Sequence, residues 1–68
     1  MKLLSVCIPV YNEENNVLNT YETIKKLLEE KLINLDYEII FADNHSIDGT
    51  GSIIEKICSK DKKVKKIF

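Results

Sequence analysis

Two apolar runs, each followed at once by a polar loop, constrain the fold of this chain more than any other feature. Residues 3–10 (LLSVCIPV) and residues 37–42 (YEIIFA) are rich in β-branched and aromatic side chains and show little polar alternation. Runs of this kind are typical of strands that are covered on both faces, as in a parallel sheet. The sequence therefore predicts two buried strands whose ends lead directly into polar loops.

The residues between these two runs show the periodicity of a helix. Asn12 is expected to cap a helix whose first turn carries Glu13 and Glu14, where the helix dipole favours negative charge. Beyond this turn the apolar side chains recur at helical spacing, and lysines and glutamates fill the opposite face. The predicted helix is amphipathic and about five turns long. Its apolar positions are Val17, Leu18, Tyr21, Ile24, Leu27, Leu28 and Leu32.

A further helix and a further strand follow the second polar loop. Residues from 50 to 59 place isoleucines on one face, with Asp48 or Thr50 as the candidate cap, and residues 64–68 (VKKIF) predict a short third strand. The order strand, helix, strand, helix, strand predicts right-handed crossovers and parallel strands in the order 3-2-1. The expected fold class is α/β, a three-layer, Rossmann-like βαβαβ arrangement.

Length and composition limit the class of protein. The chain has 68 residues, which predicts a single small domain over residues 1–68 that buries only about 60% of its unfolded surface. It is 44% hydrophobic and 31% charged, with a formal net charge of -1. These values are typical of a soluble globular protein and give no reason to expect a nucleic-acid partner.

The cysteines and the apolar start bear on the cellular compartment. Cys7 and Cys58 lack the spacing of a metal site and are predicted to be reduced core thiols. The first apolar run is short, contains Pro9 and ends in acidic residues, unlike a signal peptide. No stretch reaches the roughly 18 to 20 apolar residues that a membrane-spanning helix requires. We therefore expect a cytoplasmic location.

The loops after the first two strands hold most of the unusual polar residues. Because ligands bind at the carboxyl ends of the strands in open α/β sheets, these loops are expected to lie side by side. Neither loop has the glycine pattern of a dinucleotide or phosphate site. Tyr11 offers an aromatic ring beside the Glu13 carboxylate, which suits a nucleobase. Alternatively, Tyr11 packs on the helix and Glu13 only belongs to its first turn.

A calcium loop is an alternative interpretation of the second loop. From Asn44, the segment NHSIDGTGSIIE has oxygen side chains at its first, third and fifth positions, glycine at the sixth and Glu55 at the twelfth. This is the spacing of an EF-hand loop. However, the first ligand is Asn instead of Asp, and a predicted strand precedes the loop where an EF-hand has a helix.

The two loops together resemble a known enzyme family. The segments SVCIPVYNEENNV and YEIIFADNHSIDGTGSII resemble the opening of family 2 inverting glycosyltransferases, which have a strand ending in P-x-Y-N-E and a second strand ending in D-D-G-S-x-D-G-T. The branch that they resemble most is the polyprenyl-phosphate, dolichol-phosphate mannosyltransferase-like enzymes. The resemblance implies a GT-A fold and sugar transfer, with inversion, from a UDP- or GDP-sugar, as in cell-wall or polysaccharide biosynthesis.

The resemblance also assigns nucleotide-binding residues. Pro9, Tyr11 and Glu13 match positions that line the nucleotide pocket, and Asp43 matches the acidic residue that accepts a hydrogen bond from the base. Asn44 stands where the family usually has a second Asp and is included among the nucleotide-binding residues.

The roles of two further residues, His45 and Asp48, are considered separately. His45 replaces the usual glycine; histidine tolerates a positive φ, so it can take the same turn. A role of His45 as a catalytic base is an alternative. Asp48 matches the later Asp of the motif, where capping of the second helix is its expected role.

The remaining parts of such an enzyme are expected outside this chain. The family's D-x-D motif, which binds Mg or Mn and the diphosphate, and the acceptor site both lie further along. We therefore expect these residues to be the amino-terminal, nucleotide-recognising part of a longer enzyme, inactive alone, that acts in the cytoplasm or at the cytoplasmic face of a membrane through downstream segments. A non-catalytic nucleotide-binding or receiver-like signalling module is the alternative.

The predicted strand order has a consequence for assembly. In the order 3-2-1 the first strand lies at an edge of the sheet, and residues 3–10 are unusually apolar for an edge. Edge strands are usually protected by charges, prolines or bulges. Self-association through the first strand is therefore expected.

Overall fold

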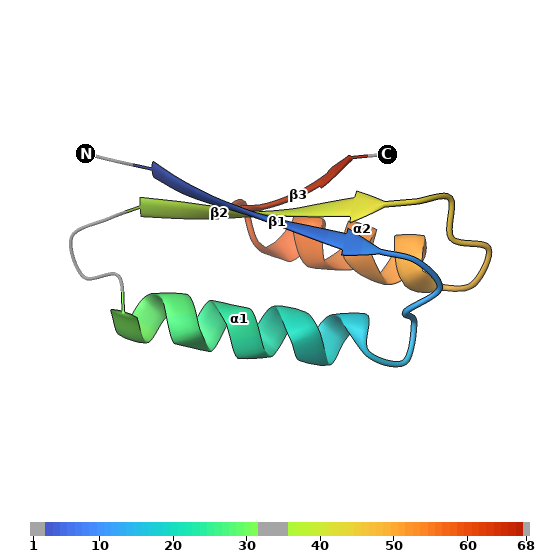
Figure 1. Cartoon of the computed structure of the whole chain (residues 1–68), viewed down its shortest axis with the longest axis horizontal. Coiled ribbons are helices and arrows are strands. Elements are labelled where there is room, and N and C mark those ends of the chain that lie inside the picture. Colours follow the sequence, from blue (N-terminus) through green and yellow to red (C-terminus); the bar gives the residue numbers. More distant parts are fainter. Residues whose placement is uncertain (1–2, 32–35, 68) are drawn as a thin grey trace.

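The computed structural model describes residues 3–31 and 36–67. Leu32 of the predicted first helix and Phe68 of the predicted third strand lie outside these residues. The elements follow the predicted order (Figure 1): β1 (Leu3–Val10), α1 (Val17–Lys31), β2 (Asp36–Asp43), α2 (Thr50–Lys60) and β3 (Val64–Ile67).

The three strands form one parallel sheet with β2 in the centre. Val6 of β1 is in register with Ile39 of β2, and Ile39 is in register with Val64 of β3. The order β1-β2-β3 is the predicted order 3-2-1 viewed from the other edge. The α/β fold and the strand order predicted from the sequence are therefore confirmed.

Both helices lie against the same face of the sheet (Figure 1). The two crossovers run in the same direction across the sheet, and right-handed crossovers in one direction place their helices on one side. The described residues therefore supply two layers of the predicted three-layer arrangement. The buried core between them consists of Val10, Val17, Tyr21, Leu28, Tyr37, Ile39, Phe41, Ile54, Ile57 and Val64.

The opposite face of the sheet carries no helix of the described residues. Ser5, Cys7 and Pro9 of β1 alternate onto this face and are exposed, while Val6 and Ile8 point to the helices and are half-buried. Both cysteines are free, and Cys58 is half-buried. The prediction that Cys7 is a core thiol is wrong, because Cys7 lies on the uncovered face.

The start of α1 differs from the prediction. The helix begins at Val17, and its first turn contains no acidic residue. The carbonyl of Glu13 accepts hydrogen bonds from the backbone of Asn16 and of Val17, each at 2.8 Å, which closes a separate turn before the helix. The proposed cap, Asn12, has a φ of 49°. Its amide side chain binds the other loop instead.

The start of α2 lies where it was predicted, but its cap differs. Gly49 occupies the N-cap position and makes no side-chain cap. Asp48, one residue earlier, accepts a hydrogen bond from the backbone of Thr50 at 2.9 Å. Neither predicted candidate is therefore the cap itself, although Asp48 satisfies the first backbone donor of the helix.

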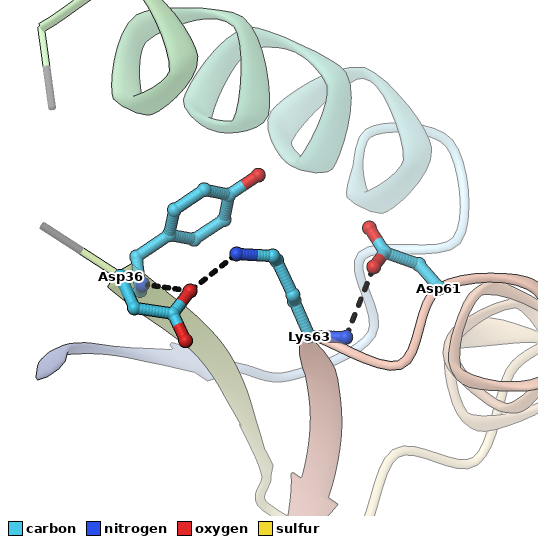
Figure 2. A network of polar contacts seen from close by, with 4 residues as sticks. Asp36, Asp61 and Lys63 are labelled. Atoms are coloured by element: carbon cyan, nitrogen blue, oxygen red, sulfur yellow. Dashed lines mark hydrogen bonds and ion pairs between the residues drawn. The ribbon is translucent and has the colours of Figure 1, made fainter. Parts of the chain in front are cut away.

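A polar network joins the elements at the end of the sheet where β2 and β3 begin (Figure 2). Lys63 pairs with Asp36, and its backbone amide donates to Oδ1 of Asp61 at 3.0 Å. The Lys63 ammonium also lies 4.3 Å from the centroid of the Tyr37 ring. On the opposite side of Asp61, the Tyr21 hydroxyl of α1 donates to Oδ2 at 2.6 Å. Asp61 therefore links α1 to the turn that leads into β3.

The Asp61 carboxylate is expected to make stability depend on acid pH. Burial opposes its ionisation, but the hydrogen bonds from Tyr21 and the Lys63 backbone, with Lys25 nearby, outweigh burial and lower its pKa. A carboxyl whose pKa is lower in the folded state contributes stability above its unfolded pKa, about 3.9, and loses it as the pH falls through the folded pKa.

Asp61→Asn should cost about 1 kcal/mol at pH 7, because it weakens a hydrogen bond to a charged acceptor. It should also reduce the loss of unfolding free energy between pH 7 and pH 3, which urea denaturation at each pH measures. Glu22→Gln on the exposed face of α1 is the matched control. If Asp61→Asn lost unfolding free energy at acid pH as steeply as wild type, the lowered pKa of Asp61 would not be a source of the acid dependence.

Candidate functional site

The loops after β1 and β2 lie side by side, as the parallel order predicted, and reciprocal hydrogen bonds join them. The backbone amide of Asn12 donates to Oγ of Ser46 at 2.9 Å, and the backbone amide of Ile47 donates to Oδ1 of Asn12 at 2.9 Å. The backbone amide of Asn44 donates to the carbonyl of Val10 at 3.0 Å and extends the parallel ladder beyond the strands. The two loops therefore form one structural unit.

A second set of contacts ties the first loop to the start of α2. The backbone amide of Glu13 donates to Oγ1 of Thr50 at 2.7 Å, and that of Glu14 donates to Oδ2 of Asp48 at 3.2 Å. The Thr50 hydroxyl in turn donates to Oδ1 of Asp48. Burial opposes ionisation of Asp48, but the hydrogen bonds from Thr50 and Glu14 outweigh it and lower its pKa. Asp48 therefore acts within the loops as an ionised structural acceptor.

Each loop contains one residue in the left-handed backbone region. Asn12 has a φ of 49° and His45 a φ of 56°. Asn and His tolerate this region better than most other residues with a side chain. The prediction that His45 takes a glycine-like turn conformation is confirmed.

Asp43 is the last residue of β2 and is almost fully buried, with 4% of its surface exposed. Its Oδ1 accepts hydrogen bonds from the backbone amide and from Oγ of Ser46, at 3.1 and 2.5 Å. Its Oδ2 faces Gly51, where a Cβ would lie 3.3 Å from it. Ser46 therefore fixes one carboxylate oxygen, while the other is directed towards the first turn of α2.

An open pocket of about 480 Å³ lies beside Asp43. The second loop, the first turns of α2 and the end of β3 form its walls. Carboxylates and hydroxyls dominate the lining, so the pocket suits a polar ligand. The lining residues are Asp43, His45, Ser46, Asp48, Gly51, Ser52, Glu55 and Lys66.

The other predicted nucleotide-binding residues lie around the loops but do not line this pocket. Pro9 is in register with Ala42 on the uncovered face of the sheet. Tyr11 is 57% exposed. Glu13 and Asn44 are exposed, and their backbone amides make the loop contacts described above. The structure thus brings all five residues to one edge of the sheet and places Asp43 alone in the pocket.

The sequence interpretation missed Lys66. This residue points to the helix side of β3, its side chain is 14% exposed, and its Nζ lies 3.3 Å from Oε1 of Glu55. A signal was available, because side chains two apart on a strand share a face and Val64 is clearly a core residue. The period of two therefore places Lys66 beside α2.

The start of α2 is already approached by carboxylates of the chain. A Cβ on Gly49 would lie 2.8 Å from Oε2 of Glu14, so the lack of a side chain at Gly49 lets this carboxylate come close. Asp48 adds a second carboxylate there. Helix N-termini favour negative charge. This helix end is therefore stabilised by the protein's own acidic groups.

The calcium alternative is inconsistent with the fold. The residues before the loop form β2, where an EF-hand has a helix. Within residues 3–31 and 36–67, no group of three or more His, Cys, Asp or Glu side chains is placed to hold a metal ion.

No helix in this part of the chain is both long and apolar enough to cross a membrane.

Comparison with known proteins assigns the family. The sequence pattern of glycosyl transferase family 2 matches residues 5–68. The chain belongs to this family, as the resemblance predicted, and the receiver-like alternative is set aside. No solved structure matches the chain at a significant level.

Several curated proteins are similar to the chain. CsbB of Bacillus subtilis, which carries the name of a glycosyltransferase, is 42% identical over 96% of the chain and 19% of its own length. The abequosyltransferase RfbV of Salmonella typhimurium is 38% identical over 78% of the chain and 15% of its own length. A prophage bactoprenol glucosyl transferase homolog of Escherichia coli is 34% identical over 85% of the chain and 18% of its own length. The chain thus spans 15% to 19% of the length of these relatives.

Proposed function

We propose that these residues recognise the nucleotide in an enzyme that transfers a sugar from a UDP- or GDP-sugar to an acceptor, with inversion. The observation that carries this proposal is the placement of Asp43. It stands at the carboxyl end of the central strand, nearly buried, with one oxygen fixed by Ser46 and the other towards an open polar pocket. Ligands of open α/β sheets bind at this edge.

The chemistry of Asp43 suits a nucleobase with an N–H group. An ionised carboxylate only accepts hydrogen bonds, and uracil and guanine both present a ring N–H. Tyr11 supplies an exposed aromatic face at the same edge of the sheet, on which a base can stack. Pro9, Glu13 and Asn44 complete the proposed nucleotide site by shaping the two loops.

The names of two relatives favour a polyprenyl phosphate acceptor and cell-surface polysaccharide synthesis. One is a bactoprenol glucosyl transferase homolog and another an abequosyltransferase. A phosphate oxygen of such an acceptor is already anionic. In an inverting displacement it attacks the anomeric carbon, and the bond from that carbon to the nucleoside diphosphate breaks. A lipid-linked acceptor also favours action at the cytoplasmic face of a membrane.

The metal that the family implies does not fit the described residues, which offer no cluster of ligands for it. We propose that Mg or Mn binds to ligands outside this chain, and we expect the 68 residues alone to transfer no sugar. The segment described here contributes binding and orientation of the nucleotide.

The proposal is tested by Asp43→Asn in the full-length protein. The variant keeps the shape and one acceptor oxygen, but loses the charge. Affinity for UDP or GDP, measured by calorimetry, should fall by roughly 1.5 to 3 kcal/mol, the typical value of a hydrogen bond to a charged group.

The control is Asp36→Asn, at the opposite end of β2, where the carboxylate pairs with Lys63. This variant should leave nucleotide affinity unchanged. Equal affinity of wild type and Asp43→Asn for both nucleotides would remove Asp43 from the site.

A further inference from the structure

A groove of about 640 Å³ lies between α1 and α2. The two helices lie next to each other against one face of the sheet (Figure 1). The residues of α2 that line the groove fall between positions 53 and 60, which is about two turns or roughly 10 Å of helix. α2 turns different side chains to this groove and to the pocket beside Asp43, so the two hollows are separate.

The floor of the groove is apolar and is formed by both helices. Leu18 and Tyr21 come from α1, and Ile53 and Ile57 come from α2. Tyr21 and Ile57 are nearly buried, whereas Leu18 is 49% exposed. A flat membrane surface does not reach side chains at the bottom of a groove, but the apolar side of a helix packs between two neighbouring helices. The shape therefore favours a third helix as the occupant.

The α2 side of the groove is positively charged. Lys56 and Lys60 are exposed, line the groove and lie four residues apart, so their ammonium groups share one side of the helix. Within residues 3–31 and 36–67 neither ammonium group makes an ion pair. The carboxylate of the lining, Glu14, lies close to Gly49 at the start of α2. An occupant with carboxylates on the flank next to α2 therefore complements the groove.

The small size of the groove favours an occupant from the same polypeptide. Eight of the described residues line it, whereas each side of a stable complex between separate proteins contributes roughly 20 to 30 residues. A helix tethered to the same chain needs less contact, because tethering raises its effective concentration. The chain covers 15% to 19% of the length of its curated relatives, so a full-length protein of their size contains ample further polypeptide.

We propose that the groove binds an amphipathic helix from the part of the full-length protein beyond residue 68. The apolar side of this helix contacts Leu18 and Ile53. Two carboxylates four residues apart on its flank pair with Lys56 and Lys60. The contact is independent of nucleotide binding beside Asp43.

Cysteine labelling of the full-length protein tests whether the groove is covered. Leu27 is the matched control for Leu18, because it lies on the same helix, is 52% exposed and does not line the groove. Leu18→Cys should react with N-ethylmaleimide about tenfold more slowly than Leu27→Cys, since the reagent must wait for the helix to leave. Both should react equally fast in urea. Equal rates in the folded protein would overturn the proposal, and protection that requires phosphatidylglycerol vesicles would assign the groove to a membrane instead.

Carbodiimide crosslinking of the full-length wild type identifies the occupant, because this reagent joins lysine amines directly to carboxylates. Lys56 or Lys60 should link to Asp or Glu side chains beyond residue 68 of the same copy, as peptide mass spectrometry of the monomer band shows. Lys26, exposed on α1, should not link to that segment. Links only to a second copy, or no link beyond residue 68, would overturn the proposal. UDP and GDP affinity should be equal in Leu18→Cys and wild type, so the helix contact and the proposed function can fail separately.

Discussion

Thr50→Val is expected to destabilise the 68-residue chain by about 2 to 4 kcal/mol, since it removes two partly buried hydrogen bonds of a buried hydroxyl without changing the shape of the side chain. Thr50 is fully buried. Its hydroxyl accepts from the backbone amide of Glu13 at 2.7 Å and donates to Asp48. Valine leaves the partly buried Glu13 amide and the Asp48 carboxylate without this hydroxyl, and each lost partner typically costs about 1 to 2 kcal/mol.

The effect is large compared with the stability available to so short a chain. A single core below about 70 residues rarely supplies more than about 3 to 5 kcal/mol. Urea denaturation followed by circular dichroism should therefore show Thr50→Val partly unfolded without denaturant. The same substitution should loosen the first loop from α2 and weaken nucleotide binding in the full-length protein.

Two further variants separate the hydroxyl from the methyl group. Thr50→Ser keeps the hydroxyl and loses one buried methyl, which should cost about 1 kcal/mol. Thr23→Val on the exposed side of α1 should change stability by less than about 0.5 kcal/mol. If Thr50→Val and Thr50→Ser were equally stable, the hydroxyl would not hold the loops together.

The order of elements could be predicted because each element has a clear sequence pattern. Residues 3–10 and 37–42 lack polar alternation, and the isoleucines of the second helix recur at helical spacing. Sequential parallel strands usually neighbour one another, and right-handed crossovers that run in one direction then give the order 1-2-3. The strand order β1-β2-β3 of the structure agrees with the order that these local signals predict.

The loop details could not be predicted, because contacts distant in sequence decide them. Asn12 and Glu13 look like the start of a helix, yet Asn12 binds Ser46 and Ile47, and Glu13 binds Thr50. These partners lie more than 30 residues away. Capping preferences describe a helix by itself and carry no information about such partners.

The candidate site was predicted only in part, because the sequence marks some of its residues and not others. Asp43 was assigned through the family resemblance, on a polar motif that directly follows an apolar strand. Lys66 lies among five other lysines in the last 13 residues, so only the face of β3 distinguishes it. The exposure of Cys7 was also missed, because an apolar run does not reveal which face of its strand a helix covers.

The edge of the sheet leads to the second large effect, self-association of the 68-residue chain through β1. β1 pairs with β2 along one side, and within residues 3–31 and 36–67 no strand pairs with its other side. Leu3 and Leu4 are 55% and 41% exposed. An exposed apolar edge is a template for pairing with another chain. We propose that two copies pair through β1 about a twofold axis, the usual symmetry of dimers.

Cys7→Lys is expected to weaken this association several-fold. Cys7 lies on the uncovered face of β1, so a lysine there leaves the core intact. Two such lysines come close in an antiparallel pair of β1 strands, and like charges directly opposite one another on an exposed sheet face cost about 1 kcal/mol. Sedimentation equilibrium measures the change, and amide exchange along residues 4–8 reports whether the edge is paired.

Asn19→Lys on the exposed side of α1 is the control, because it changes the net charge equally at a distance from the edge. This control should associate like wild type, since it leaves the β1 backbone groups and the exposed leucines as they are. Equal association of Cys7→Lys, Asn19→Lys and wild type would place the contact elsewhere. A wild-type chain that stays monomeric at high concentration would contradict pairing through β1 altogether, because an unpaired apolar edge should associate most readily under that condition.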